Sequence, residues 1–166
     1  MREGEKGMKR VDKILGNLQY QIYLQRNMEA ETDRVLCRHN LQHCLDVARV
    51  GYIVALENNL EVEKELIYAT ALLHDIGRWR QYADGTDHAV TGGELAKGIL
   101  MDCDFSEFEI ELIVQAIIKH RKGTDLETAL EQVIFEGDKK SRLCIDCGAI
   151  QGCKRFTGNN KPLLHY

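Results

Sequence analysis

The feature that most constrains this chain is its near absence of proline. Among 166 residues the sole proline is Pro162, close to the C-terminus. Because proline interrupts helices, almost the whole chain is free to be helical, and apolar residues recur at helical spacing through most of it. The length suffices for one sizeable core. We therefore expect an all-α, single-domain helical bundle of about six to seven helices.

The charge balance narrows the possible partners. Lys and Arg number 22 against 26 Asp and Glu, which gives a formal net charge of −4. That balance argues against a broad nucleic-acid-binding face and favours a small-molecule partner. No apolar run approaches the roughly 20 residues that a membrane span needs. The N-terminal MREGEKGMKR lacks a following apolar signal region, so we expect a cytoplasmic protein that binds neither nucleic acid nor membrane.

Helical spacing and capping residues divide the chain into expected elements. An N-terminal helical segment within residues 1–34 is expected to pack on a core of residues 35–143, followed by a cysteine-containing tail, 144–166. Residues 76–87 have no clean period and are expected to form an active-site loop. The expected helices are 8–26, a long one within 39–59, one starting after Asn59, 88–102, one capped by Ser106 and Glu109 that ends at His120, and one capped by Thr124 and Glu127 that runs to about Cys144.

Two adjacent metal-type ligands, His74 and Asp75, end the apolar run from Ala69 to Leu73. If this helix stops near Gly77, both side chains project from its last turn, and a carboxylate can hold one ion or bridge two. A His-Asp pair alone is weak evidence, because a hydrogen-bonded pair can also cap a helix. Its significance depends on the other ligand-type residues of the chain.

The chain contains six candidate metal ligands, each expected at the end or on the edge of a helix. In sequence order they are His43, His74, Asp75, His88, His120 and Asp138. Taken singly, each has an ordinary structural alternative. His43 could lie at the edge of the core, and His120 could favour a helix C-terminus because of the helix dipole. Asp138 could pair with Lys139 or Arg142 in solvent. His39 and His165 fit no position of the pattern and are expected on the surface or behind the ligands.

The order of these residues resembles that of the HD-domain superfamily of metal-dependent phosphohydrolases, in its variety with two metals, over about residues 35–143. The matching segments are QHCLDVARV, ALLHDIGRW, DHAVTGGELA, IIKHRKG and FEGDKKSR. The resemblance implies that one ion is held by His43, His74, Asp75 and Asp138. It implies that His88 and His120 hold the second ion, with Asp75 as the bridge. Such ligands suit iron, manganese, zinc or nickel, and we favour iron or manganese.

A water-based mechanism follows, because the chain has no nucleophile-elbow serine or cysteine and no Gly-rich phosphate loop. Two ions would lower the pKa of a bridging water and clamp phosphoryl oxygens, so that hydroxide attacks phosphorus in line. Arg78 is the first candidate to stabilise the developing charge, followed by Lys119 and Arg121. A solvent-facing Arg78 is the alternative.

The resemblance favours a phosphohydrolase that acts on a nucleotide or a dinucleoside polyphosphate. The patterns H-A-x-x-G-G and H-x-x-G are similar to those of the bacterial branch that splits symmetrical dinucleoside tetraphosphates. Two alternatives stay open. The same ligands occur in di-iron oxygenases of the superfamily, and a nucleotide-binding or sensor module could keep the metals without turnover.

Six cysteines in a cytoplasmic protein are expected to be thiols or ligands, since that compartment keeps thiols reduced. Cys37 precedes His43 by six residues, and Cys144 follows Asp138 by six. On antiparallel helices that meet at a shared ion, both would lie about 9 Å from it in the same direction. With Cys147 and Cys153 they could form a structural zinc site or an iron–sulfur cluster. Reduced cysteines that pack an irregular tail are the alternative.

Overall fold

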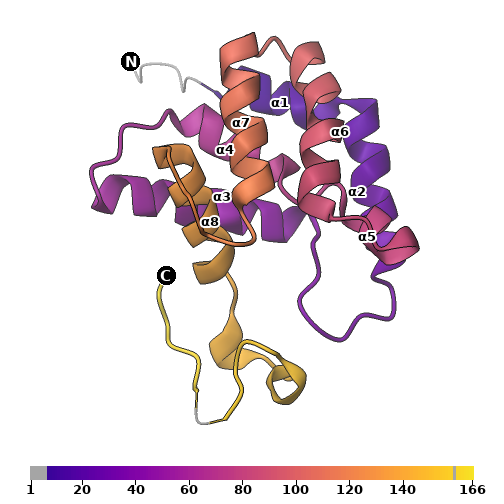
Figure 1. The fold of residues 1–166 in the computed structure, drawn as a ribbon, viewed down its shortest axis with the longest axis vertical. Helices are drawn as coiled ribbons and strands as arrows, with labels where there is room; N and C mark the ends of the chain where they lie inside the picture. The colour runs from indigo at the N-terminus through magenta and orange to yellow at the C-terminus, as the bar shows by residue number, and fades with distance from the viewer. Residues whose placement is uncertain (1–6, 159) are drawn as a thin grey trace, which may run out of the picture.

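The chain, described by a computed structural model over residues 7–158 and 160–166, is all-α, as predicted. No strand occurs among these residues, and Figure 1 shows the helices gathered into one bundle. The α-helices are α1 (Lys9–Gly16), α2 (Leu18–Ala30), α3 (Leu41–Glu57), α4 (Lys64–Leu73), α5 (Arg78–Asp84), α6 (His88–Asp102), α7 (Glu107–Lys119) and α8 (Ala129–Lys140). Two short 3-10 turns, η1 (Cys144–Asp146) and η2 (Ile150–Gly152), follow. In the described part of the chain, none of the helices combines the length and apolar character required to span a membrane.

Helix α4 lies at the centre of the bundle. It contacts α1, α3, α6, α7 and α8, and seven of its residues are buried. Each fully buried Leu or Ile contributes roughly 1.5–3 kcal/mol to folding. Because α4 is enclosed on nearly all sides, its C-terminal end delivers His74 and Asp75 to the bundle interior rather than to solvent.

Helices α3 and α8 touch through their backbones. A Cβ atom added at Gly137 would lie 2.8 Å from the carbonyl oxygen of Val47 and 3.2 Å from the nitrogen of Gly51. A Cβ atom at Gly51 would lie 3.2 Å from the carbonyl oxygen of Val133. Glycine is required at this crossing because no side chain fits between the two helices. The close approach brings His43 on α3 near Asp138 on α8.

The N-terminal half departs from the expected helices at three places. The predicted helix over 8–26 is two helices, because the Asn17 side chain accepts hydrogen bonds from the backbone nitrogens of Gln19 and Tyr20 and starts α2. Asn59 does not cap α4. It has a φ of 51°, in the left-handed region, and α4 begins only at Lys64. The predicted loop 76–87 contains α5, which packs on α2 and α6.

The capping prediction holds for α7 and is wrong for α8. Ser106 and Glu109 form the expected capping box at α7. The box of α8 is made by Thr128 and Glu131, four residues later than the predicted Thr124 and Glu127. α8 ends at Lys140, so Cys144 lies outside it.

Candidate metal centre

A turn of four residues after α4 carries the His-Asp pair. α4 ends at Leu73, and α5 begins at Arg78 directly after Gly77. A Cβ atom at Gly77 would lie 2.6 Å from the carbonyl oxygen of His88 and 2.7 Å from the nitrogen of Gly92. Only glycine permits this contact with α6, which places His88 beside Asp75.

The first group of ligand atoms comes from α3, the turn after α4, and α8. Nε2 of His74 lies 3.0 Å from Oδ2 of Asp75, and Nε2 of His43 lies 3.7 Å from the same oxygen. Oδ1 of Asp138 lies 3.4 Å from Nε2 of His43 and 3.9 Å from Nε2 of His74. One ligand atom from each of the four residues lies within 4.8 Å of the others, which is close enough for all of them to bind one ion.

The second group shares Asp75. Its Oδ1 lies 3.1 Å from Nε2 of His88 and 3.7 Å from Nε2 of His120. The two histidine nitrogens are 3.4 Å apart. Asp75 therefore turns one oxygen toward each group, which is the arrangement expected of a carboxylate that bridges two ions.

The outer nitrogen of each of three histidines has a hydrogen-bond acceptor. Nδ1 of His74 lies 2.7 Å from the carbonyl oxygen of Ala71, and Nδ1 of His120 lies 2.6 Å from that of Ile117. Nδ1 of His88 contacts Oε1 of Gln81. Donation from Nδ1 leaves the Nε2 lone pair of each ring free to bind a metal.

Two buried polar atoms at the centre lack a hydrogen-bond partner. They are Nε2 of His74 and Oδ1 of Asp75, whose side chains are almost fully enclosed. Buried polar atoms without a partner are costly, and a divalent cation bound by both would remove that cost. The residues therefore fit a metal.

Both carboxyl groups of the centre are held ionised. Burial alone would raise the pKa of Asp75, but the surrounding histidines, above all His74 and His39, hold it well below its ordinary value. Burial would likewise raise the pKa of Asp138. A hydrogen bond from His43 and nearby positive charges hold it well below. Two buried negative charges on one site favour cations.

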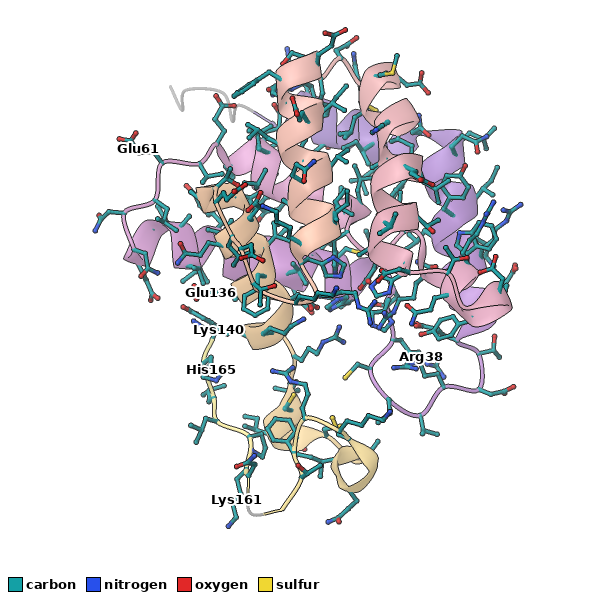
Figure 2. The ribbon with its side chains drawn as sticks, viewed as in Figure 1. Arg38, Glu61, Glu136, Lys140, Lys161 and His165 are labelled. Carbon is teal, nitrogen blue, oxygen red and sulfur yellow. The ribbon has the colours of Figure 1, made fainter. Side chains whose placement is uncertain are left out.

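Behind the centre, a buried chain of hydrogen bonds positions Arg78. Glu31 accepts a 2.7 Å bond from the backbone nitrogen of His39, and its Oε1 lies 2.5 Å from the ring Nδ1. Tyr82 donates to the same carboxylate at 2.7 Å. Nη2 of Arg78 lies 2.9 Å from Nε2 of His39 and donates a hydrogen bond to it. His39 thus lies buried behind the ligands, whereas His165 is exposed on the C-terminal segment (Figure 2).

The ionisation states fit this chain of bonds. Burial lowers the pKa of His39 to about 4, so the ring is neutral near pH 7 and can donate from Nδ1 while Nε2 accepts from Arg78. Burial would raise the pKa of Glu31, but the bonds from His39 and Tyr82 lower it to about 2. The sequence pattern held no sign of Glu31, since it lies far from the HD motif and outside every helical stripe.

Asn27 on α2 ties the turn after α4 to the rest of the bundle. Its Nδ2 donates to the carbonyl oxygen of Asp75 at 2.8 Å, and its Oδ1 accepts from the backbone nitrogen of Trp79 at 2.8 Å. The side chain is buried, with an exposed fraction of 1%. No sequence signal marked this residue, because its partners lie about 50 positions away.

We expect Asn27→Ala to lower the free energy of unfolding by about 2 kcal/mol, since it leaves the backbone nitrogen of Trp79 without its acceptor and removes one of the two bonds to the carbonyl oxygen of Asp75. Urea denaturation measures the loss. The control is Gln25→Ala, an exposed residue of the same helix. A loss no larger than that of the control would contradict the bridging role of Asn27.

A cavity of about 370 Å³ opens over the two groups. Its floor includes Asp75, His88, His120 and Asp138. Figure 2 shows side-chain nitrogen atoms gathered at the lower ends of α6 and α7. The cationic residues that line the cavity are Arg34, Arg78, Arg121, Lys139, Arg142 and Arg155.

The three cationic side chains expected to stabilise the developing charge do not all lie at the cavity. Arg78 and Arg121 line the cavity, and Nη1 of Arg121 is held 2.8 Å from Oδ2 of Asp87. Lys119 does not line the cavity. Its Nζ lies 3.1 Å from both Glu127 and the buried Glu131, so it stabilises the start of α8. We therefore do not place Lys119 in the reaction.

Three of the four cysteines proposed as ligands lie near one another, although not on antiparallel helices as expected. Neither Cys37 nor Cys144 is on an α-helix, so the antiparallel-helix argument is wrong. Cys37 is in the α2–α3 loop (residues 31–40), and Cys144 starts η1. Nevertheless Cys37, Cys144 and Cys153 line the same cavity.

Comparisons of sequence and structure find known proteins that are similar to this chain. An uncharacterized protein of Clostridium beijerinckii is 45% identical over 88% of this chain and 92% of its own length. Ribonuclease Y of Clostridium perfringens is 32% identical over 75% of this chain, which spans only 20% of that enzyme. A solved structure of a predicted HD superfamily hydrolase from an uncultured Thermotogales bacterium aligns with a TM-score of 0.58 and 26% identity, over 80% of this chain and 72% of that one. The HD domain family matches residues 40–145, a range that begins just before His43 and ends after Asp138. The chain therefore belongs to the HD domain family.

Proposed function

We propose that the protein is a metal-dependent phosphohydrolase that acts on a nucleotide or a dinucleoside polyphosphate. The observation that carries this proposal is the contrast between the floor and the walls of the cavity. Its floor consists of metal-type ligands, and its walls include five arginines and one lysine. Guanidinium groups bind phosphate through paired hydrogen bonds, so walls of this kind favour a phosphorylated substrate. The cavity volume lies at the lower end of the range for small-molecule sites.

The residues of the cavity floor would bind the metal ions, and those of its walls would contact the substrate. His43, His74, Asp75 and Asp138 would hold one divalent ion, and His88 and His120 with Asp75 would hold the other. Bound metal supplies Lewis acidity and an activated water. Iron or manganese remains our preferred metal.

Arg78 is the wall residue best placed to act on the substrate. Because His39 accepts a hydrogen bond from its guanidinium, little conformational freedom is lost when a phosphoryl group binds. A fixed cation beside the metal ligands can stabilise charge that develops on phosphoryl oxygens.

We expect Arg78→Ala to lower turnover by about a hundredfold or more while metal content stays unchanged. Arg80→Ala is the matched control, since Arg80 is exposed on the same helix and does not line the cavity. Steady-state rates and metal analysis on both variants check the expectation. Equal rates for the two variants would show that another cation has this role.

The decisive experiment measures phosphate and nucleotide release by protein loaded with manganese or, without oxygen, ferrous iron. The panel contains nucleoside mono-, di- and triphosphates, diadenosine tetraphosphate and a short RNA, the last because of the ribonuclease Y relatives. Hydrolysis of one nucleotide class, lost in His74→Ala, supports the proposal. Metal-loaded protein that hydrolyses none of them but consumes oxygen with an organic substrate would overturn it in favour of a di-iron oxygenase. Tight nucleotide binding without turnover would overturn it in favour of a sensor module.

A further inference from the structure

The C-terminal segment, residues 141–166, is folded without a core of its own. Among its described residues, which exclude position 159, no side chain is buried. Its regular structure consists of η1 and η2, whose backbone bonds join residues two or three positions apart. Figure 1 shows this segment extending below the bundle. Ordering each residue costs about 1–2 kcal/mol, and segments without a core usually depend on a crosslink or a metal.

Three cysteines mark the turns of this segment. Cys144 is the first residue of η1, Cys147 follows its end, and Cys153 follows the end of η2. The carbonyl oxygen of Cys147 accepts a bond from Ile150 at 3.3 Å, and that of Cys153 accepts one from Phe156 at 3.1 Å. Each of these two cysteines is therefore held at the start of a tight turn.

A fourth cysteine faces this segment from the α2–α3 loop. Cys37 lines the cavity together with Cys144 and Cys153. Its carbonyl oxygen accepts a 2.8 Å bond from Nε of Arg34, which fixes the local backbone. Figure 2 shows sulfur atoms in the space between this loop and the C-terminal segment.

The thiols lie near one another and near cationic side chains. Burial raises the pKa of Cys144, Arg155 lowers it, and the thiols of Cys37, Cys147 and Cys153 are near enough to raise it further. The guanidinium of Arg142 is also close to Cys37. Cations beside a group of thiols stabilise thiolates, which are the form that binds metals.

The spacing of the thiols favours a cluster over a single ion. Two sulfurs on one zinc ion are at most about 4.6 Å apart, since each Zn–S bond is about 2.3 Å. Among the described residues, no group of three ligand atoms within 4.8 Å includes a cysteine. An iron–sulfur cluster binds each thiolate to a different iron and so holds the four sulfurs farther apart.

We propose that Cys37, Cys144, Cys147 and Cys153 hold a [4Fe–4S] cluster that joins the C-terminal segment to the α2–α3 loop beside the cavity. This centre is separate from the HD ligands and does not rest on the proposed hydrolase function. Its position explains how a segment without buried side chains keeps a defined structure.

The test uses the full chain, purified without oxygen and reconstituted with ferrous iron and sulfide under reducing conditions. We expect a brown protein that contains acid-labile sulfide, and we expect Cys147→Ser to lose both colour and sulfide. Cys103→Ala is the matched control, because Cys103 is buried at the end of α6 and its loss should leave the sulfide content unchanged. Asp75→Asn should also keep the sulfide, which separates this centre from the HD ligands. Far-UV circular dichroism confirms that each variant retains its helices.

Three outcomes would overturn the proposal. One is zinc without sulfide that disappears in Cys147→Ser, which would mean a single-ion site. Another is folded, reconstituted protein that contains neither sulfide nor metal beyond the HD centre. The third is sulfide that persists in each of the four single cysteine variants.

Discussion

Asp75→Asn is expected to remove both metal ions and to lower hydrolysis by roughly a thousandfold or more. Asp75 is the residue common to both ligand groups, with one oxygen in each. Asparagine keeps the shape of the side chain but removes the negative charge at the point where two cations would meet. Metal analysis after dialysis and rate measurements at saturating metal check both effects.

Asp33→Asn is the control for this variant, because Asp33 is exposed in the α2–α3 loop and does not line the cavity. The control should retain its metals and its rate. If Asp75→Asn kept both ions at wild-type affinity, Asp75 would not be the bridge, and the pairing of the two groups would have to be abandoned.

Gly77→Ala is expected to lower the free energy of unfolding by about 3 kcal/mol and to weaken the second metal site more than the first. The added Cβ would meet the carbonyl oxygen of His88 and the nitrogen of Gly92, and neither backbone atom can move without moving α6. A shift of α6 would take His88 away from Asp75, whereas His43 and Asp138 are on other helices.

Denaturant unfolding and metal titration measure these two effects. Gly98→Ala is the control, because a Cβ atom there meets nothing within 4 Å. Alanine within a helix should leave stability unchanged or raise it by up to about 1 kcal/mol. Equal stability of the two variants would mean that the turn and α6 are less tightly joined than the structure indicates.

The sequence predicted those features that depend on residue order and helical period. The all-α class is confirmed, as is the capping box of Ser106 and Glu109. The expected ligand residues are brought together because each lies at the end or on the edge of a helix whose apolar face is buried in the bundle. A buried stripe fixes the rotation of a helix, and with it the direction of the residues at its end.

Features that depend on tertiary contacts could not be predicted from the sequence. Two consecutive capping signatures precede α8, and the later one is used because Glu131 is buried, whereas Glu127 is exposed. Helix α5 is too short to show a clear period, and its contacts with α2 and α6 stabilise it.

Lys119 shows why neighbours in sequence need not share a site. It directly precedes His120, but successive residues of a helix point about 100° apart. His120 therefore faces Asp75 while Lys119 faces the start of α8. Arg78 lies at the cavity, and its action on the substrate stays a prediction. The His39 and Glu31 that position it come from a distant loop.

The glycine contact between α3 and α8 bears on which ions the protein can select. Because backbone touches backbone there, the separation of the two helices that carry His43 and Asp138 is set by the main chain. A larger ion would have to push these helices away from each other, whereas a smaller one needs no such movement. Calcium binds its ligands at about 2.3–2.6 Å, against about 2.0–2.2 Å for zinc. Discrimination by ionic radius is therefore expected to persist even when the side chains around the ligands are replaced.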